Sequence, residues 1–196
     1  MRPLLKRLLQ QSQPLTTSNS WLVVGLGNPG PNYQSNRHNI GQQVLDILAD
    51  KHSQRFKSHK TGTLVAEVSH SSQKLILAKS QGFMNVSGSP VQKLLQFYSI
   101  PLDRLVVIHD ELDIEFGELR KKFDGGHAGH NGLRDISAKC GTGYHRLRFG
   151  IGRPAGQMAV SDFVLQNFST SERKELPVLI ELAIDQVLEI TTPKTT

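Results

Sequence analysis

Cysteine is nearly absent from this chain of 196 residues, because Cys140 is the single one. One thiol cannot form an internal disulfide framework, and its rarity favours a reducing compartment. The sequence also lacks any uninterrupted apolar run of about 18 residues, so it predicts no membrane-spanning helix. Acidic residues are missing before Asp46, which makes the start of the chain unlike the rest.

The acid-free N-terminal segment, residues 1–20, combines Arg2, Lys6 and Arg7 with pairs of leucines and then with Gln, Ser and Thr. This composition is typical of organelle presequences, so we expect a disordered segment that targets the protein to mitochondria. An N-terminal tail without a targeting role, on a cytoplasmic protein, is the alternative. Residues 21–196 are expected to form one domain, since no linker or internal repeat interrupts them.

Charge is unevenly distributed within that domain, although the whole chain carries only a net +6. Residues 103–118 contain six acids and one base, whereas residues 120–153 contain eight bases and two acids. A concentrated basic block predicts a surface that binds phosphate groups, as on a nucleic acid. Two ordinary solvated faces are the alternative interpretation.

Apolar periodicity divides the domain into alternating strands and helices. Strands are expected at 21–26, 63–68, 74–79, 105–109 and 147–151, and helices at 40–51 and 91–98. Ser169 and Glu172 form a capping-box pattern before a third helix that extends to about residue 190, although Pro177 is an alternative start for it. Strands that alternate with helices predict an α/β fold with a largely parallel central sheet.

The loop 25–30 (GLGNPG) matches the glycine pattern of dinucleotide-binding sites. That function needs a helix directly after the loop and an acid at the end of a second strand. Pro29 and Pro31 disfavour such a helix, and Asp46 and Asp50 fall inside the expected helix 40–51. The glycines more simply allow a sharp turn that places Asn28 at the end of a strand, where clefts of α/β sheets form.

His38 and Asp110 are the candidate catalytic pair. His38 begins the expected helix 40–51, and Asp110 follows the strand 105–109, so both lie where a sheet edge could bring them together. A carboxylate that accepts a hydrogen bond from an imidazole determines its tautomer and raises its basicity, which suits a general base toward water.

Two glycine-rich loops, 82–88 and 125–132, contain Asn85 and Asn131, whose amides both donate and accept hydrogen bonds and so suit a peptide backbone or an oxyanion. Ordinary turns are the alternative for each loop. His127 and His130 lack further ligands at zinc spacing, so we expect no metal site.

Five motifs follow one another along the chain: the loop 25–30 with Tyr33 and the run 37–39, then 83–88, 109–113, 125–132 and 146–152. In this order, over about residues 22–190, they resemble the bacterial-type peptidyl-tRNA hydrolases. The resemblance implies a monomeric α/β domain with a twisted, mixed, mostly parallel sheet flanked by helices. Its implied activity is hydrolysis of the ester between a peptide and the 3′ ribose of tRNA, without metal or cofactor.

Residue by residue, the resemblance implies that His38 activates the attacking water and that Asp110 orients and polarises His38. It assigns substrate positioning to Asn28, Asn85 and Asn131, with Tyr33 and Met84 in the cleft, and tRNA-phosphate contacts to Lys122 and Arg148. Peptidyl-tRNA is the implied partner, and we expect no membrane contact. A non-catalytic RNA-binding relative that assists organelle splicing is the alternative.

The sequence departs from the family pattern at four positions. Gln157 stands where bacterial members often have a phosphate-binding Lys, and we expect Arg153 to compensate. Ala128 replaces a usual Gly, which restricts the backbone angles of that loop. Ser80 and Gly82 replace a usual Pro and Thr. None of these changes touches His38 or Asp110, so we expect retained activity with altered tRNA affinity.

Overall fold

A seven-stranded mixed sheet organises the chain, with strand order β2-β3-β4-β1-β5-β7-β6. The computed structural model describes residues 19–192, so the predicted presequence 1–20 lies outside the described residues except for its last two. The strands are β1 (Ser20–Gly25), β2 (Lys57–His59), β3 (Thr63–His70), β4 (Gln73–Ser80), β5 (Leu105–Glu111), β6 (Leu119–Phe123) and β7 (His145–Gly150).

The four central strands are parallel, because β1 pairs with β4 and β5, and β5 pairs with β7. The other three pairings, β2 with β3, β3 with β4 and β6 with β7, are antiparallel. Every residue of β5 is buried, as expected for a central strand covered on both faces. The predicted α/β fold with a mixed sheet and a parallel centre is therefore confirmed.

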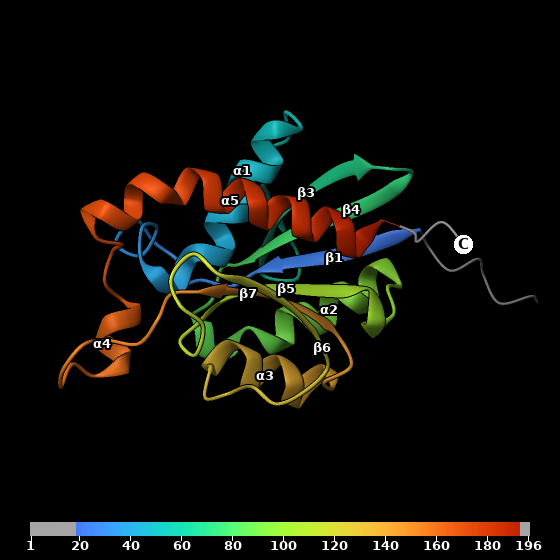
Figure 1. Ribbon diagram of the computed structural model, residues 1–196. Helices are drawn as coiled ribbons and strands as arrows, with labels where there is room; N and C mark the ends of the chain where they lie inside the picture. The colour runs from blue at the N-terminus through green and yellow to red at the C-terminus, as the bar shows by residue number, and fades with distance from the viewer. Residues whose placement is uncertain (1–18, 193–196) are drawn as a thin grey trace, which may run out of the picture.

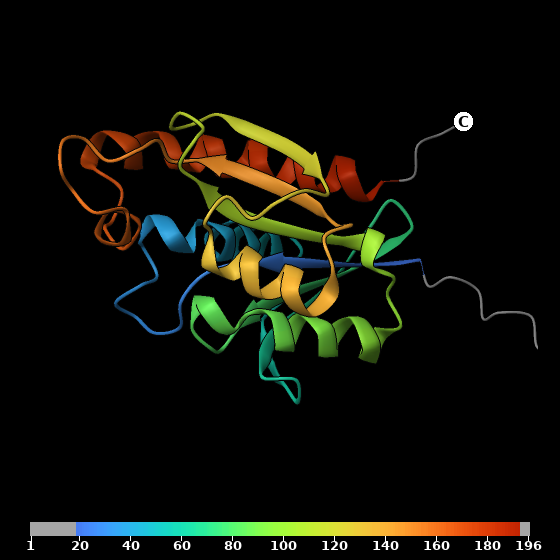
Figure 2. The same cartoon turned by 90° about the horizontal axis from the view of Figure 1, so that it is seen from below.

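Helices cover both faces of the sheet (Figure 1). On one face lie α1 (Ile40–Lys51) and α5 (Thr170–Thr191), and on the other lie α2 (Gly88–Tyr98) and α3 (Asn131–Cys140), which Figure 2 shows from below. The short α4 (Val160–Val164) and the 3-10 turns Arg37–Asn39, Met84–Val86 and Leu102–Arg104 complete the elements. Each face has its own apolar core, so both layers stabilise the sheet. Within residues 19–192, no helix is long and apolar enough to cross a membrane.

The C-terminal helix begins where its capping box predicts, and Pro177 is not its start. The Ser169 side chain accepts a hydrogen bond from the Glu172 amide, and the Glu172 carboxylate accepts one from the Ser169 amide. Pro177 lies inside α5, whose buried residues continue on both sides of it, for example Leu176 and Ile180. Packing of this apolar stripe therefore outweighs the loss of one helical hydrogen bond at the proline.

Four elements lack a prediction from periodicity: β2, β6, α3 and α4. β2 and β6 are the edge strands, and four of the five β6 residues are exposed, among them Arg120, Lys121 and Lys122. Charged edge strands carry no continuous apolar pattern, because their side chains are solvated and protect the edge from pairing.

Candidate active site

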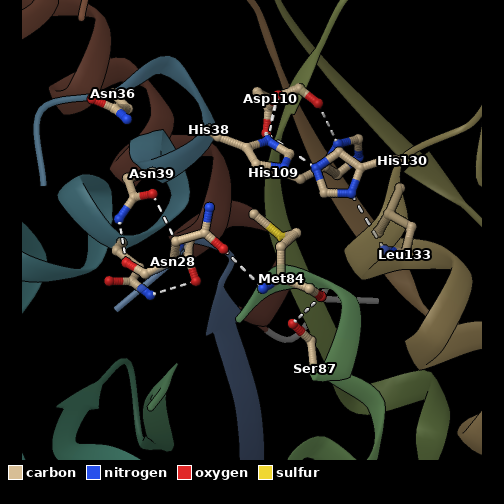
Figure 3. Close-up of polar contacts among 12 residues, drawn as sticks. Asn28, Asn36, His38, Asn39, Met84, Ser87, His109, Asp110, His130 and Leu133 are labelled. Atoms are coloured by element: carbon tan, nitrogen blue, oxygen red, sulfur yellow. Dashed lines mark hydrogen bonds and ion pairs between the residues drawn. The ribbon is translucent and has the colours of Figure 1, made fainter. Parts of the chain in front are cut away.

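His38 and Asp110 meet at the end of the parallel strands, as their positions in the sequence predicted. The His38 Nδ1 atom lies 2.9 Å and 3.0 Å from the two carboxylate oxygens of Asp110 (Figure 3). Asp110 is the next-to-last residue of β5. Only 2% of its side chain is exposed, against 11% of the His38 side chain. Since Asp110 accepts a hydrogen bond from the Nδ1–H group, the Nε2 atom of His38 keeps its lone pair for a proton from the cleft.

Two close backbone contacts bring His38 over the strand ends. A Cβ atom at Gly25 would lie 2.3 Å from the Gly41 carbonyl oxygen, and one at Gly41 would lie 2.3 Å from that of Ile108. Such distances exclude any side chain at either glycine, so the first turn of α1 rests directly on β1 and β5. His38, three residues before Gly41, is therefore held next to the end of β5.

A second histidine, His130, shares the Asp110 carboxylate. Its Nε2 atom lies 3.0 Å from Asp110 Oδ1, and its Nδ1 atom accepts a hydrogen bond from the Leu133 amide at the start of α3. Because Nδ1 is the acceptor, Nε2 carries the proton, and the Nε2–H group donates a hydrogen bond to Asp110. The rings of His38 and His130 lie 5.0 Å apart between centroids. Neither the charge pattern nor the spacing of motifs in the sequence predicted that His130 would contact Asp110 beside His38.

Burial and the two imidazoles set the protonation states. Burial disfavours the charge on His38, but the Asp110 charge and hydrogen bond outweigh it and raise the His38 pKa above its ordinary value. Burial also opposes the Asp110 charge, yet His38 and His130 lower the Asp110 pKa well below its usual range, so the carboxylate stays ionised. By contrast, burial and the neighbouring His130 lower the pKa of His109 to about 3, so this imidazole stays neutral.

Asn28 is held in one orientation by its neighbours. Its backbone N–H donates to the Asn39 side chain and its carbonyl accepts from the same side chain, at 3.0 Å and 2.9 Å. The Met84 amide donates to Asn28 Oδ1 at 2.9 Å (Figure 3). A backbone amide can bond only to the oxygen of the side chain, so Nδ2 is the end of Asn28 that is available. Among the described residues, no protein atom accepts from that Nδ2.

Arg37 connects the turn before α1 to the segment between α4 and α5. Its guanidinium donates to the Asn167 carbonyl at 2.6 Å and to the Glu172 carboxylate at 2.7 Å, and it lies 4.4 Å from the centre of the Phe163 ring. Only 6% of Arg37 is exposed. This anchor holds α4 beside His38.

The catalytic pair lies between two adjoining hollows of about 350 and 370 Å³. Both are lined by His38, Asn131, Ser161 and Val164. The first extends along the loop 127–130 toward Arg153, and the second along 83–85, so the strand ends, the loop before α3 and α4 all contribute walls. Size and mixed polar lining suit a substrate cleft.

A model of the family described as "Peptidyl-tRNA hydrolase" matches residues 22–196. The chain belongs to the peptidyl-tRNA hydrolase family. The resemblance seen in the order of the motifs is therefore confirmed over the whole domain.

Individual relatives agree with this assignment. A peptidyl-tRNA hydrolase of Streptomyces coelicolor is 52% identical over 175 residues, covering 85% of this chain and 86% of its own. One of Leifsonia xyli subsp. xyli is 53% identical over 173 residues, covering 87% and 90%. A crystal structure of Acinetobacter baumannii peptidyl-tRNA hydrolase superposes with a TM-score of 0.76 at 34% identity, covering 90% of this chain and 96% of that one. A nucleosidase of Arabidopsis thaliana, 8% identical with a TM-score of 0.55, shares the fold alone.

The remaining substrate residues expected from the peptidyl-tRNA hydrolase resemblance differ in their placement. Met84, Asn85 and Asn131 line the second hollow beside Asn28; Met84 is buried, whereas both asparagines are exposed. Tyr33 is half-buried and lines neither hollow, but its ring lies 6.3 Å from that of Phe83, which lines the second hollow. The structure therefore places Phe83, and not Tyr33, in the cleft wall.

The basic residues gather on one face of β6 and β7. Lys122 pairs in register with Arg146, and Arg120 with Arg148, so these four side chains share the face on which α3 lies. Arg146 is buried and donates to the Gly125 and Gly126 carbonyls, which fastens the loop that carries His130. The charge of Arg153, in contrast, is partly neutralised, because its guanidinium donates to Asp113 at 2.8 Å and 2.5 Å.

Ala128 has a φ of 47°, in the left-handed region. A residue with a Cβ atom is strained there by roughly 1–2 kcal/mol, so this loop has a backbone conformation that favours glycine at the position of Ala128. Sequence reasoning missed further site residues, namely Asn39, His130, Ser161 and Val164. The signal for His130 was its position directly before Asn131, whereas the α4 residues carry no motif.

His38, Asp110 and His130 are also the kind of group that can hold a metal ion, since their ligand atoms lie within 4.8 Å of one another. In this arrangement the nitrogen atoms face the carboxylate at ordinary hydrogen-bond distances of 2.9–3.0 Å. The His38 and His130 imidazoles therefore both form hydrogen bonds with the Asp110 carboxylate.

Proposed function

We propose that this protein hydrolyses the ester bond between a peptide and the 3′ ribose of tRNA in peptidyl-tRNA, and so recycles tRNA. The observation that carries the proposal is the His38–Asp110 pair, which faces a cleft beside Asn28 in a chain of this family. A non-catalytic RNA-binding role would not require a buried, ionised carboxylate behind an imidazole that lines the cleft.

In the first step, His38 Nε2 takes a proton from a water molecule as its oxygen attacks the ester carbonyl carbon. His38 becomes an imidazolium, which the ionised Asp110 stabilises through the Nδ1 hydrogen bond. Asp110 itself keeps its charge, because its pKa lies far below that of the imidazole. The reaction therefore needs no metal ion to generate hydroxide.

The tetrahedral intermediate carries a negative charge on the former carbonyl oxygen. Asn28 Nδ2, held by the Met84 amide on the other end of the side chain, is oriented to donate to this oxygen. When the intermediate collapses, the ester C–O bond breaks, and the leaving 3′ oxygen takes the proton back from His38. The products are a peptide with a free carboxyl group and a tRNA with a free 3′ hydroxyl group, and His38 is neutral again.

The tRNA body is assigned to the basic face of β6 and β7. Lys122 is exposed there and Arg148 is half-buried, so both can contact phosphates, with a smaller contribution from the Asp113-paired Arg153. We propose a monomer, since one chain supplies the cleft and the basic face together.

The test is release of labelled peptide from a peptidyl-tRNA by the full chain in the presence of EDTA. Wild type should cleave, His38→Ala should lose at least about 10²-fold in kcat, and His70→Ala, a histidine at the far end of β3, should match wild type. Cleavage abolished by EDTA would contradict the metal-free reaction. Binding of tRNA without cleavage by wild type would replace this proposal with the RNA-binding relative.

We also propose that residues 1–20 target the protein to mitochondria. The support is compositional: Arg2, Lys6 and Arg7 among leucines, with no acid before Asp46. Fusion of residues 1–20 to a fluorescent protein should direct that protein to mitochondria. A fusion that carries the three substitutions Arg2→Ala, Lys6→Ala and Arg7→Ala together should stay in the cytoplasm. Cytoplasmic location of both fusions would contradict the proposal.

A further inference from the structure

A third hollow, of about 510 Å³, is lined in part by Asn28, and neither His38 nor Asp110 lines it. Its lining is dominated by amide side chains, and we call it the amide groove: Asn28, Gln34, Asn39, Gln42, Gln43 and Gln81. Asn28 lines both the amide groove and the hollow beside His38, so the two are adjacent. The proposed reaction does not use the groove.

Position in the sheet separates the amide groove from the basic face. Lys79 and Ser80, at the end of β4, form its floor, whereas Lys122 and Arg148 lie on β6 and β7. In the strand order β4-β1-β5-β7-β6, the catalytic Asp110 of β5 lies between them. An ester that joins tRNA to a peptide has tRNA on one side and the peptide on the other. With tRNA over β6 and β7, the peptide therefore extends toward β1 and β4.

The groove has no net charge to attract phosphate. Its charged side chains are Asp46 and Lys79, which form an ion pair with each other, and the Lys79 ammonium also lies 4.2 Å from the centre of the Phe56 ring. A neutral groove does not favour a second stretch of RNA, which would require unpaired basic residues.

The amides of the groove match the hydrogen-bonding pattern of a peptide main chain. Gln42 Nε2 donates to the Gly27 carbonyl at 3.1 Å, and Gln43 Nε2 donates to the Asn36 carbonyl at 3.2 Å. Both side-chain nitrogens are thus engaged, which leaves the Oε1 atoms as acceptors for peptide N–H groups. Gln34 and Gln81 are exposed and can serve as donors to peptide carbonyls.

Gly27 allows these amides to lie close together. A Cβ atom at Gly27 would lie 2.8 Å from the Gln42 side chain and 2.9 Å from that of Asn39. Any other residue would therefore displace one of the two from its present position. The positions of the Asn39 and Gln42 side chains in the groove beside Asn28 therefore depend on Gly27.

We propose that the amide groove is a second substrate subsite, which binds the main chain of the peptide residues that precede the residue esterified to tRNA. This inference rests on the proposed hydrolase function. Main-chain recognition by side-chain amides is independent of peptide sequence, which suits an enzyme that acts on many peptides. Occupancy of the groove positions the ester relative to Asn28, so longer peptides should react faster than single blocked residues.

The experiment compares kcat/KM for two substrates that share the tRNA and the esterified residue: an N-acetylated aminoacyl-tRNA and a tetrapeptidyl-tRNA. Gln81→Trp fills the groove with a bulky ring, and Gln54→Trp makes the same change at an exposed site away from it. We expect wild type and Gln54→Trp to prefer the tetrapeptide, and Gln81→Trp to lower the ratio of the two kcat/KM values about 10-fold.

A second variant removes hydrogen-bonding groups without adding bulk. Gln34→Ala/Gln81→Ala should lower the same ratio about 3-fold, and thermal unfolding verifies that each variant is folded. An unchanged ratio in both groove variants, or no preference for the tetrapeptide in wild type, would overturn the subsite. Absence of hydrolysis of both substrates by wild type would instead overturn the proposed function, so the two failures are distinguishable.

Discussion

Replacement of Asp110 by Asn tests the electrostatic role of the buried carboxylate. The substitution keeps the size of the side chain and one hydrogen-bond acceptor but removes the charge that faces His38 and His130. In the wild-type protein that charge outweighs burial and raises the His38 pKa above 6.5. In the variant the effect of burial remains alone, so the His38 pKa falls below its ordinary value.

The loss in rate follows from the imidazolium that forms during the reaction. With Asp110 98% buried on its side chain, the developing His38 charge loses a buried ion-pair partner, a change of about 3–5 kcal/mol. At 1.36 kcal/mol for each factor of ten, we expect kcat to fall by roughly 10²- to 5 × 10³-fold at the pH of maximum activity.

The assay is single-turnover release of labelled peptide between pH 5 and 9 for wild type, Asp110→Asn and the control Asp50→Asn, which changes an exposed acid on α1. A base must be neutral to act, so wild-type activity is lost as the pH falls through the raised His38 pKa. The acidic limb should move to lower pH in Asp110→Asn and stay unchanged in Asp50→Asn. A slower variant whose acidic limb keeps the wild-type midpoint would refute the reasoning.

Four further substitutions test separate parts of the site. Arg37→Ala breaks the partly buried pair with Glu172 and should lower the free energy of unfolding by about 3 kcal/mol in denaturant titration; a loss under 1 kcal/mol would contradict the anchor. Asn28→Ala should lower kcat about 10²-fold with little change in tRNA affinity, because Nδ2 acts on the oxyanion; a loss of affinity alone would argue against this. Arg148→Ala should weaken tRNA binding and reduce its salt dependence by about one counterion, and an unchanged salt slope would remove it from the phosphate contacts. Ala128→Gly removes the strain of a Cβ atom at positive φ and should raise the free energy of unfolding by about 0.5–1 kcal/mol in thermal unfolding. An unchanged or lower free energy of unfolding would contradict this.

Much of the fold could be predicted because its central elements are buried. The helix Ile40–Lys51 has the predicted bounds, and the strands β1, β3, β4, β5 and β7 agree with prediction to within a few residues at each end. Burial on both faces makes a strand apolar throughout, so it is visible in the sequence. The exposed edge strand β6 and the short α4 were not visible, since solvated side chains obey no such pattern.

The candidate site was predictable where it depends on strand ends. His38 stands at the start of the predicted helix 40–51 and Asp110 directly follows the predicted strand 105–109, and the ends of parallel strands meet at one edge of the sheet. His130 was not predictable as a partner of Asp110, because its loop is held by Arg146, whose guanidinium reaches the Gly125 and Gly126 carbonyls from β7. That contact joins residues about twenty positions apart and leaves no periodic trace.

By itself, the sequence determined the family and the α/β fold and named His38 and Asp110 as candidate partners, because ordered motifs and buried strands are local properties of the chain. Tertiary structure alone decided the shared carboxylate of His38 and His130, the orientation of Asn28 by the Met84 amide, and the neutral groove beside it. Hydrogen bonds between distant segments set these features, since each depends on where a partner lies in space and not on which residues precede it.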